Sequence, residues 1–282
     1  MASLAMRAGP LAALASAVLF GVSTPLAKPL LGAVEPQLLA GLLYLGSGLG
    51  LALAWPWLRR GPHAQEAALG RADWPWLLAA ILTGGVAAPV LLLLGLARVP
   101  AGTASLLLTL ESVLTLALAW IAFREPVDRR LALGAAAILA GAVTLAWQGA
   151  PEPGAGLGMA AIAAACLGWA LDNNLTRKVA LADPVQIAML KGLVAGAVNT
   201  GLALAAGAAW PGAGTLALAA LLGLVAYGVS LVLFVTALRL IGTARTGAYF
   251  ATAPFVGAAL AVLLGEPLGP RLLLAGALMA FG

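Results

Sequence analysis

The chain has 282 residues, of which 63% are hydrophobic and only 9% are charged, and its formal net charge is +5. Soluble domains carry about 25% charged residues, so this chain cannot cover a water-facing surface and lipid must be its solvent. The basic residues are scattered through short loops rather than gathered in a block, which argues against nucleic acid as a partner.

Ten apolar segments follow one another along the chain, separated by short polar loops. A membrane-spanning helix needs about 20 mostly apolar residues. The expected spans are 10–31, 37–58, 74–97, 101–122, 131–147, 156–176, 184–209, 216–238, 243–264 and, as a partial span, 271–282. The first segment is long enough to cross, so we interpret it as a membrane helix rather than a cleaved signal peptide. The last is too short to cross, so we expect the natural helix to continue beyond residue 282.

One long segment occurs twice. The stretch from Arg98 to Pro126 returns, half a chain length later, as the stretch from Arg239 to Pro267. Each copy has a basic residue, a turn of small residues, an apolar span and a Glu-Pro pair. We therefore interpret the chain as a tandem duplication of one unit. We expect a first five-helix unit at residues 1–148, a linker at 149–155 and a second five-helix unit at 156–282.

An odd number of helices in each unit reverses the second copy across the bilayer. The sequence therefore predicts an all-α polytopic membrane protein with ten transmembrane helices in two inverted repeats, an architecture of many secondary transporters.

Basic loop residues predict the orientation, because Lys and Arg in short loops favour the cytoplasmic side. With a cytoplasmic N-terminus, eleven of the 15 basic residues are cytoplasmic, Lys28, Arg98 and Arg271 are outside, and Lys191 lies within a helix. We predict a multi-pass protein of the bacterial inner membrane with both termini in the cytoplasm.

The duplicated pattern resembles a known family. In each unit the fourth helix ends in Glu-Pro (F-R-E-P and L-G-E-P) and the fifth is rich in small residues (L-G-A-A-A-I-L-A-G-A and L-L-A-G-A-L-M-A-F-G). This resembles the EamA type of the drug/metabolite transporter (DMT) superfamily and, within it, the YddG-type amino-acid exporters. The resemblance implies a ten-helix basket without an ATPase, alternating access, and a cavity lined by helices one, three, four, six, eight and nine.

Few polar side chains lie within the apolar segments. Placing such a group in a bilayer costs free energy, so each one is a candidate for a functional role. Glu111, near the middle of the fourth helix, is a structural carboxyl group, a proton carrier or a ligand for a substrate amine. Asp172 and Lys191 lie at similar depth on successive helices, which favours a structural ion pair over a pair that opens to the cavity.

Aromatic residues complete the expected site. The midpoints of the fourth and ninth helices meet in an inverted repeat, so Tyr249 lies near the depth of Glu111, and Trp169 lies nearby on the sixth helix. We predict that these three residues border one cavity. The full set of predicted substrate-binding residues is Glu111, Trp169, Tyr249, Tyr227, Thr252, Ser112, Asp172 and Asn173.

Enzymatic chemistry is not expected. The single histidine, His63, lies in a loop, and the chain has no H-E-x-x-H motif, no Cys/His cluster for zinc and no P-loop. We therefore expect no cofactor and no metal. A channel remains an alternative, although inverted duplication favours a carrier.

The mixture of both charges with aromatic faces suits a small zwitterion with an apolar side chain, so we predict export of aromatic or neutral amino acids. The alternative substrate is a lipophilic cation held by Glu111 and Tyr249. A phosphorylated substrate is disfavoured because Lys191 is the only base available at this depth. We expect the protein to act on small molecules in the lipid bilayer as a monomer, with a dimer as the alternative.

Overall fold

The computed structural model describes residues 2–58, 60, 66–123, 129–147 and 154–282. These residues form helices, turns and loops, and no strand occurs among them. The predicted linker at 149–155 lies largely outside the described residues, which resume at Gly154. Gly154 has a φ of 88° and precedes the first residue of the next helix, a conformation that favours glycine.

Nine helical runs in the described residues are long and apolar enough to cross a membrane. Five of them come before residue 148. The first span consists of α1 (Ala2–Gly21), α2 (Ser23–Ala27) and η1 (Pro29–Gly32), and the second is α3 (Pro36–Leu58). The third consists of η2 (Arg71–Asp73), α4 (Trp74–Ala80), η3 (Ile81–Ala87) and α5 (Ala88–Leu96), the fourth of α6 (Ala101–Leu107) and α7 (Leu110–Phe123), and the fifth is α8 (Arg129–Ala146).

Those after residue 153 are α9 (Ala155–Val179); α10 (Pro184–Ala205); α11 (Ala213–Gly223), η4 (Leu224–Val229) and α12 (Ser230–Ile241); and α13 (Thr243–Phe250) with α14 (Ala253–Leu263). A shorter apolar helix of 12 residues, α15 (Pro270–Phe281), follows.

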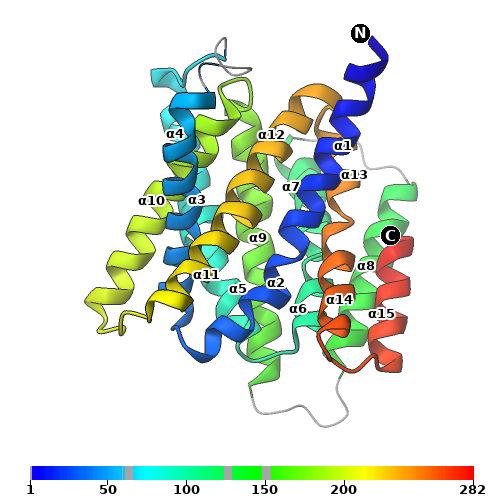
Figure 1. Cartoon of the computed structure of the whole chain (residues 1–282). Helices are drawn as coiled ribbons and strands as arrows, with labels where there is room; N and C mark the ends of the chain where they lie inside the picture. The colour runs from blue at the N-terminus through cyan, green and yellow to red at the C-terminus, as the bar shows by residue number, and fades with distance from the viewer. Residues whose placement is uncertain (1, 59, 61–65, 124–128, 148–153) are drawn as a thin grey trace.

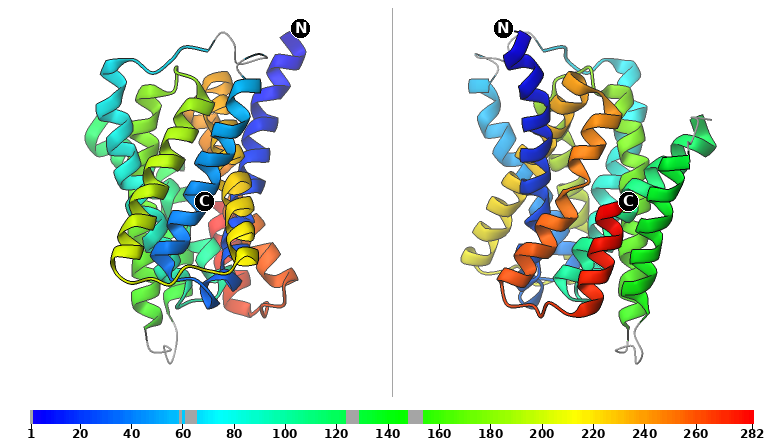
Figure 2. Two further views of the ribbon diagram at one scale, coloured as in Figure 1. Left: turned by 60° about the vertical axis from the view of Figure 1, so that its left-hand side comes forward. Right: turned by 90° about the vertical axis from the view of Figure 1, so that its right-hand side faces the viewer.

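The spans stand side by side and successive spans run in opposite directions, with the turns gathered at two ends (Figure 1). The N-terminus lies at one end, which we call the N-terminal end. The opposite end carries η1 and the turn between α5 and α6. Along one edge of the bundle α15 packs against α8 (Figure 2).

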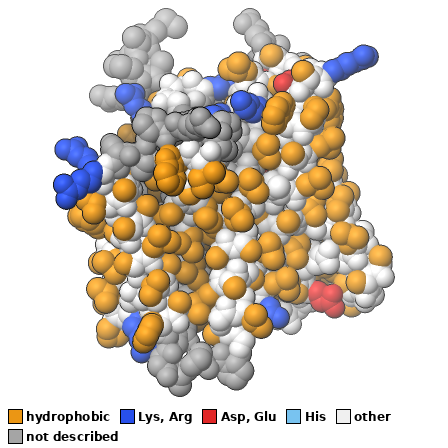
Figure 3. All heavy atoms as spheres, turned by 180° about the vertical axis from the view of Figure 1, so that it is seen from behind, with side chains coloured by type: hydrophobic (Ala, Val, Ile, Leu, Met, Phe, Trp, Pro, Cys, Tyr) orange, Lys and Arg blue, Asp and Glu red, His pale blue; other side chains and the backbone are white. Residues whose placement is uncertain are grey.

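Large apolar side chains are exposed along the sides of the bundle, for example Leu53 at 72% and Leu263 at 82% of their surface. Figure 3 shows hydrophobic side chains over the middle of one face and basic side chains mainly toward its ends. Because a water-facing surface does not have this composition, the outer surface fits contact with lipid.

Several spans are irregular at mid-depth. The segments η3 and η4 are π-helical, and the runs α1–α2, α6–α7 and α13–α14 are each interrupted by one or two residues. Pro25, Pro89 and Pro254 lie in the first turn after an irregularity, where a missing N–H costs least. Such irregular backbone within a membrane is tolerated where protein or a cavity surrounds it.

Glycines allow α3 to pack tightly against two neighbours in the centre of the bundle. A Cβ atom added at Gly192 of α10 would lie 2.5 Å from the amide nitrogen of Gly48. A Cβ at Gly46 would lie 2.5 Å from the Cα of Ala220 on α11. Small residues at helix contacts let backbones approach, as in other membrane bundles.

The end opposite the N-terminal end is held by two charged side chains. Glu266 follows α14, and its carboxylate accepts hydrogen bonds from the amides of Ala101 at 2.6 Å and Gly102 at 2.7 Å, the first residues of α6. The ammonium group of Lys28 donates to the carbonyl oxygens of Leu96 and Val99, on either side of the same turn. Glu266 belongs to the second Glu-Pro pair; the first pair, Glu125-Pro126, lies outside the described residues.

Replacing Glu266 by Ala should lower the free energy of unfolding by about 1–2 kcal/mol, because the start of α6 loses its capping acceptor. Thermal unfolding of the detergent-solubilised protein measures this change. Glu35→Ala is the control, because Glu35 is exposed at the same end. We expect a change within about 0.5 kcal/mol for the control. Equal effects of the two substitutions would mean that the cap does not stabilise the fold.

Candidate functional site

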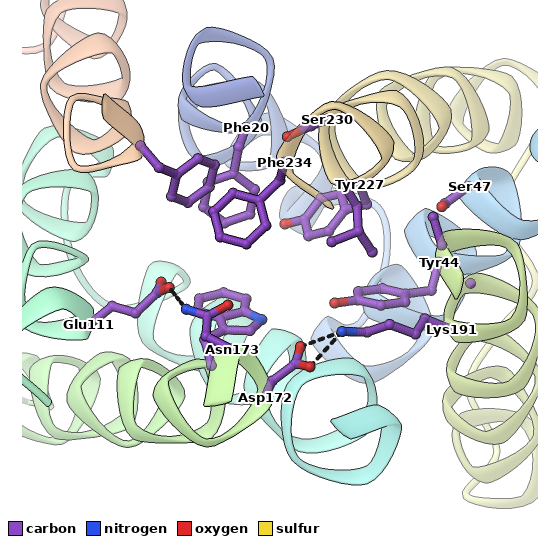
Figure 4. A pocket seen from close by; sticks show the side chains of 16 residues that line it. Phe20, Tyr44, Ser47, Glu111, Asp172, Asn173, Lys191, Tyr227, Ser230 and Phe234 are labelled. Carbon is purple, nitrogen blue, oxygen red and sulfur yellow. Dashed lines mark hydrogen bonds and ion pairs between the residues drawn. The ribbon is translucent and has the colours of Figure 1, made fainter. Parts of the chain in front are cut away.

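A cavity lies about midway along the spans and holds about 580 Å³ of empty space, open solvent included. Side chains from seven spans reach it (Figure 4). The polar lining residues are Tyr44, Ser47, Glu111, Asp172, Asn173, Lys191, Tyr227 and Ser230, and the aromatic ones without a polar group are Phe20, Phe234 and Phe250, with Trp169 beside them.

The spans that line the cavity differ from those implied by the family resemblance. The second and seventh spans contribute through Tyr44 of α3 and Lys191 of α10, whereas no side chain of the third span lines it. The third span has Gly84 and Gly85 at this depth, within η3. Because these residues have no side chain to extend, neighbouring spans cover them on the cavity side.

One polar cluster is an ion pair. Lys191 and Asp172, expected to pair, lie 2.5 Å apart from Nζ to Oδ1 and 2.6 Å from Nζ to Oδ2. The Thr176 hydroxyl donates to Asp172 at 2.8 Å and lies 3.3 Å from the ammonium nitrogen. Both charged side chains are less than a tenth exposed. Removing an ion pair from water costs desolvation free energy, and additional hydrogen bonds such as these help to offset it.

The second polar cluster joins the fourth and sixth spans. Glu111 is the second residue of α7, directly after the interruption between α6 and α7. Its Oε1 accepts a hydrogen bond from the Asn173 amide at 2.6 Å. A carboxylate in the first turn of a helix is favoured by the helix dipole. Figure 4 shows Glu111 and Lys191 on opposite sides of the cavity, with Asp172 and Asn173 between them on α9.

Aromatic rings form the remaining wall, and Phe20 is their common contact. Its ring centroid lies 5.8 Å from those of Trp169 and Tyr227, both in edge-on geometry, and 5.4 Å from that of Phe250. The rings of Tyr44 and Tyr227 are tilted by 47° and their centroids lie 5.3 Å apart. Aromatic pairs at these separations stabilise one another beyond the effect of burial, so this wall is a connected unit.

A backbone carbonyl orients two of these rings. The oxygen of Gly84, in the π-helical segment η3, accepts hydrogen bonds from the Tyr44 hydroxyl at 2.9 Å and from the Trp169 indole N–H at 3.0 Å. Buried Tyr and Trp side chains need such partners for their polar tips. A Cβ atom at Gly84 would overlap the Asp172 side chain. Gly84 therefore stands directly behind three residues of the cavity wall.

Five of the eight predicted binding residues line this cavity: Glu111, Trp169, Asp172, Asn173 and Tyr227. The other three require correction. Tyr249 is half-buried and does not line the cavity, where its neighbour Phe250 does. Successive helical residues point about 100° apart, so only one of the two can face inward.

Thr252 and Ser112 are exposed side chains away from the lining. The Thr252 hydroxyl donates to the carbonyl of Tyr249 at 2.7 Å, within the turn between α13 and α14. Ser112 follows Glu111 on α7, so it is rotated away from the cavity for the same helical reason.

Phe20, Tyr44, Phe234 and Phe250 were not predicted. Each lies within an apolar segment, where an aromatic residue facing a cavity has the same local sequence as one facing lipid. The repeat offered the only signal, since it placed the midpoint of the ninth helix, and hence Phe250, at the depth of Glu111.

A family model and one curated relative both describe transporters. The model of the EamA-like transporter family matches residues 7–147 and 156–282. An uncharacterized transporter from Methanothermobacter thermautotrophicus is 28% identical over 302 residues, covering 97% of this chain and 84% of its own length. One protein known from a crystal structure superposes with a TM-score of 0.72 over 96% of this chain and 93% of its own, at 21% identity, which is a likeness of fold alone.

Proposed function

We propose that this chain, which belongs to the EamA-like transporter family, is a secondary transporter that exports small amphipathic metabolites by alternating access. The observation that supports this most is the mid-depth cavity, because it combines buried charged groups with a connected aromatic wall. Polar groups at that depth are costly and mark substrate pathways. Members of the family are transporters, so we propose no enzymatic activity.

The proposed architecture is a ten-helix inverted repeat, with units at 1–148 and 156–282. Three observations support it. The family model matches once in each unit. The second unit runs through its spans in the opposite sense from the first (Figure 1). The π-helical segments η3 and η4 occur in the third and eighth spans, which correspond in the repeat. We propose the monomer as the functional unit.

For the substrate we propose two candidate classes. The first, implied by the resemblance to YddG-type exporters, is amino acids with aromatic or neutral side chains. The aromatic wall suits an apolar side chain, and the two polar clusters carry both signs of charge. The second candidate is a lipophilic cation, favoured because the lining residues include two carboxyl groups and one lysine.

Transport by the purified protein in liposomes tests the carrier proposal. Labelled tryptophan and labelled tryptamine should each be offered to liposomes preloaded with the unlabelled compound. We expect uptake that saturates with concentration and is accelerated by exchange. Flux that rises in proportion to concentration would indicate a channel, and no flux above empty liposomes for either compound would contradict the proposal.

For orientation we propose cytoplasmic termini in a bacterial inner membrane. Single cysteines at Ala33 and Ala68, both exposed and at opposite ends of the bundle, test it in a Cys166→Ala background. A membrane-impermeant maleimide added to intact cells should label the cysteine at Ala33 and spare the one at Ala68. The reverse pattern would overturn the orientation.

A further inference from the structure

We propose that the cavity recognises an ammonium group through Glu111 and has no unpaired basic side chain for a carboxylate among its described lining residues, so its substrates are amphipathic amines rather than amino acids. This inference rests on the proposed transport function and names the substrate class of the same site. It follows from which charged groups around the cavity already have partners.

Lys191 is the only basic side chain among the described lining residues, and its donors are in use. An ammonium group has three donors. Two of them point to the Asp172 oxygens, at 2.5 and 2.6 Å, and the third lies 3.3 Å from the Thr176 hydroxyl. A substrate carboxylate could bind Lys191 only by breaking this pair, which would strand the Asp172 charge at low exposure.

Asp172 is equally occupied. Both of its oxygens accept from Lys191, and Oδ1 also accepts from Thr176. The charges of Asp172 and Lys191 cancel within the pair. The pair therefore shapes the cavity wall without offering a free charge to either end of a zwitterion.

Glu111 is different. Its Oε1 accepts from Asn173 at 2.6 Å, and within the described part of the chain no side chain donates to its second oxygen. Glu111 is thus the carboxyl group around the cavity that has no basic partner among the described side chains. An amine would supply both the missing donor and the missing positive charge, whereas a carboxylate placed beside Glu111 would be repelled.

The aromatic wall extends the same preference. The ring of Phe20 contacts those of Phe250, Trp169 and Tyr227. Ring faces attract cations and bury an apolar body, but they do not attract a carboxylate. The complete site fits a compound with one protonated amine and one aromatic or aliphatic body.

Three matched ligands test the inference: tryptamine, tryptophan, which adds a carboxylate, and tryptophol, which replaces the amine by a hydroxyl. Binding is measured by calorimetry on the purified protein, and transport by exchange in liposomes. We expect tryptamine to bind roughly tenfold or more tightly than either other ligand, since hydrogen bonds to charged groups are the stronger class.

The variant Glu111→Gln keeps the shape of the side chain and an oxygen for Asn173. It should weaken tryptamine binding roughly tenfold and leave tryptophol binding unchanged. Glu35→Gln, at an exposed carboxylate, is the control and should leave all three affinities unchanged. Unchanged thermal unfolding of Glu111→Gln would show that the effect arises at the site.

Two results would overturn the inference and leave the transport function standing. One is tryptophan bound and exchanged as well as tryptamine. The other is tryptamine binding that is unaffected in Glu111→Gln. If the folded protein neither binds nor exchanges either compound, the proposed function fails together with the inference.

Discussion

Replacing Lys191 by Met should destabilise the protein by about 3–5 kcal/mol, and replacing Asp172 by Asn should have a similar effect. In each variant one member of a buried ion pair remains without its partner, in side chains that are only 4% and 8% exposed. The double replacement should be less damaging than the sum of the single ones, because no charge is then stranded. Thermal and denaturant unfolding of the four proteins in detergent gives the coupling energy.

A second ion pair in the same molecule provides the control. Arg239 and Glu66 lie 2.5 Å apart near the N-terminal end, and each side chain is 22% exposed. Because both side chains are more exposed than those of Lys191 and Asp172, we expect the coupling energy of Arg239→Met with Glu66→Gln to be smaller than that of the more buried pair. Strictly additive effects at Lys191 and Asp172 would show that the two groups do not interact, contrary to their separation in the structure.

Replacing Gly84 by Ala should lower both stability and substrate affinity, with an expected loss of about 1–3 kcal/mol in the free energy of unfolding. The added methyl group would overlap Asp172, which must move away from η3. The carbonyl of Gly84 also orients Tyr44 and Trp169, so a shift of this segment displaces two walls of the cavity at once. Unfolding measurements and saturation curves for exchange, on the same preparation, separate the two effects.

Gly201→Ala is the matched control, because a Cβ atom at Gly201 of α10 meets no other atom within 4 Å. It should leave exchange unchanged and should not destabilise the fold, since Ala is a better helix former than Gly. Normal affinity in Gly84→Ala, even with reduced stability, would show that the Gly84 carbonyl does not position the binding residues.

Much of the fold could be predicted from the sequence, because the signals are local. The apolar segments predicted nine spans that the described residues contain, and the weak tenth segment corresponds to the short helix α15. The depth of a residue along a span is also a local property. For that reason the sequence was enough to place Glu111 near mid-depth, with Trp169 a few residues away in depth, whereas Asp172 was expected nearer the cytoplasmic end of its helix.

Which side of each helix faces the cavity could not be predicted in this way. In a water-soluble helix the polar face marks the outside, but here both the lipid-facing and the inward-facing sides are apolar, so helical periodicity carries little information. Phe20 and the lipid-facing residues around it therefore look alike in sequence. Phe250 lines the cavity whereas Tyr249, its neighbour on α13, does not, and nothing in the local sequence distinguishes the two positions.

The sequence by itself determined the class of protein, the number of long apolar segments, the duplication and the depth of the buried polar groups, since composition, segment length and spacing suffice for these. Only the tertiary structure decided that Lys191 is engaged by Asp172 and Thr176, that one oxygen of Glu111 has no donor among the described side chains, and that Gly84 supports the aromatic wall. These are relations between residues of different helices, and they depend on the rotation and close approach of whole helices, which tertiary packing sets.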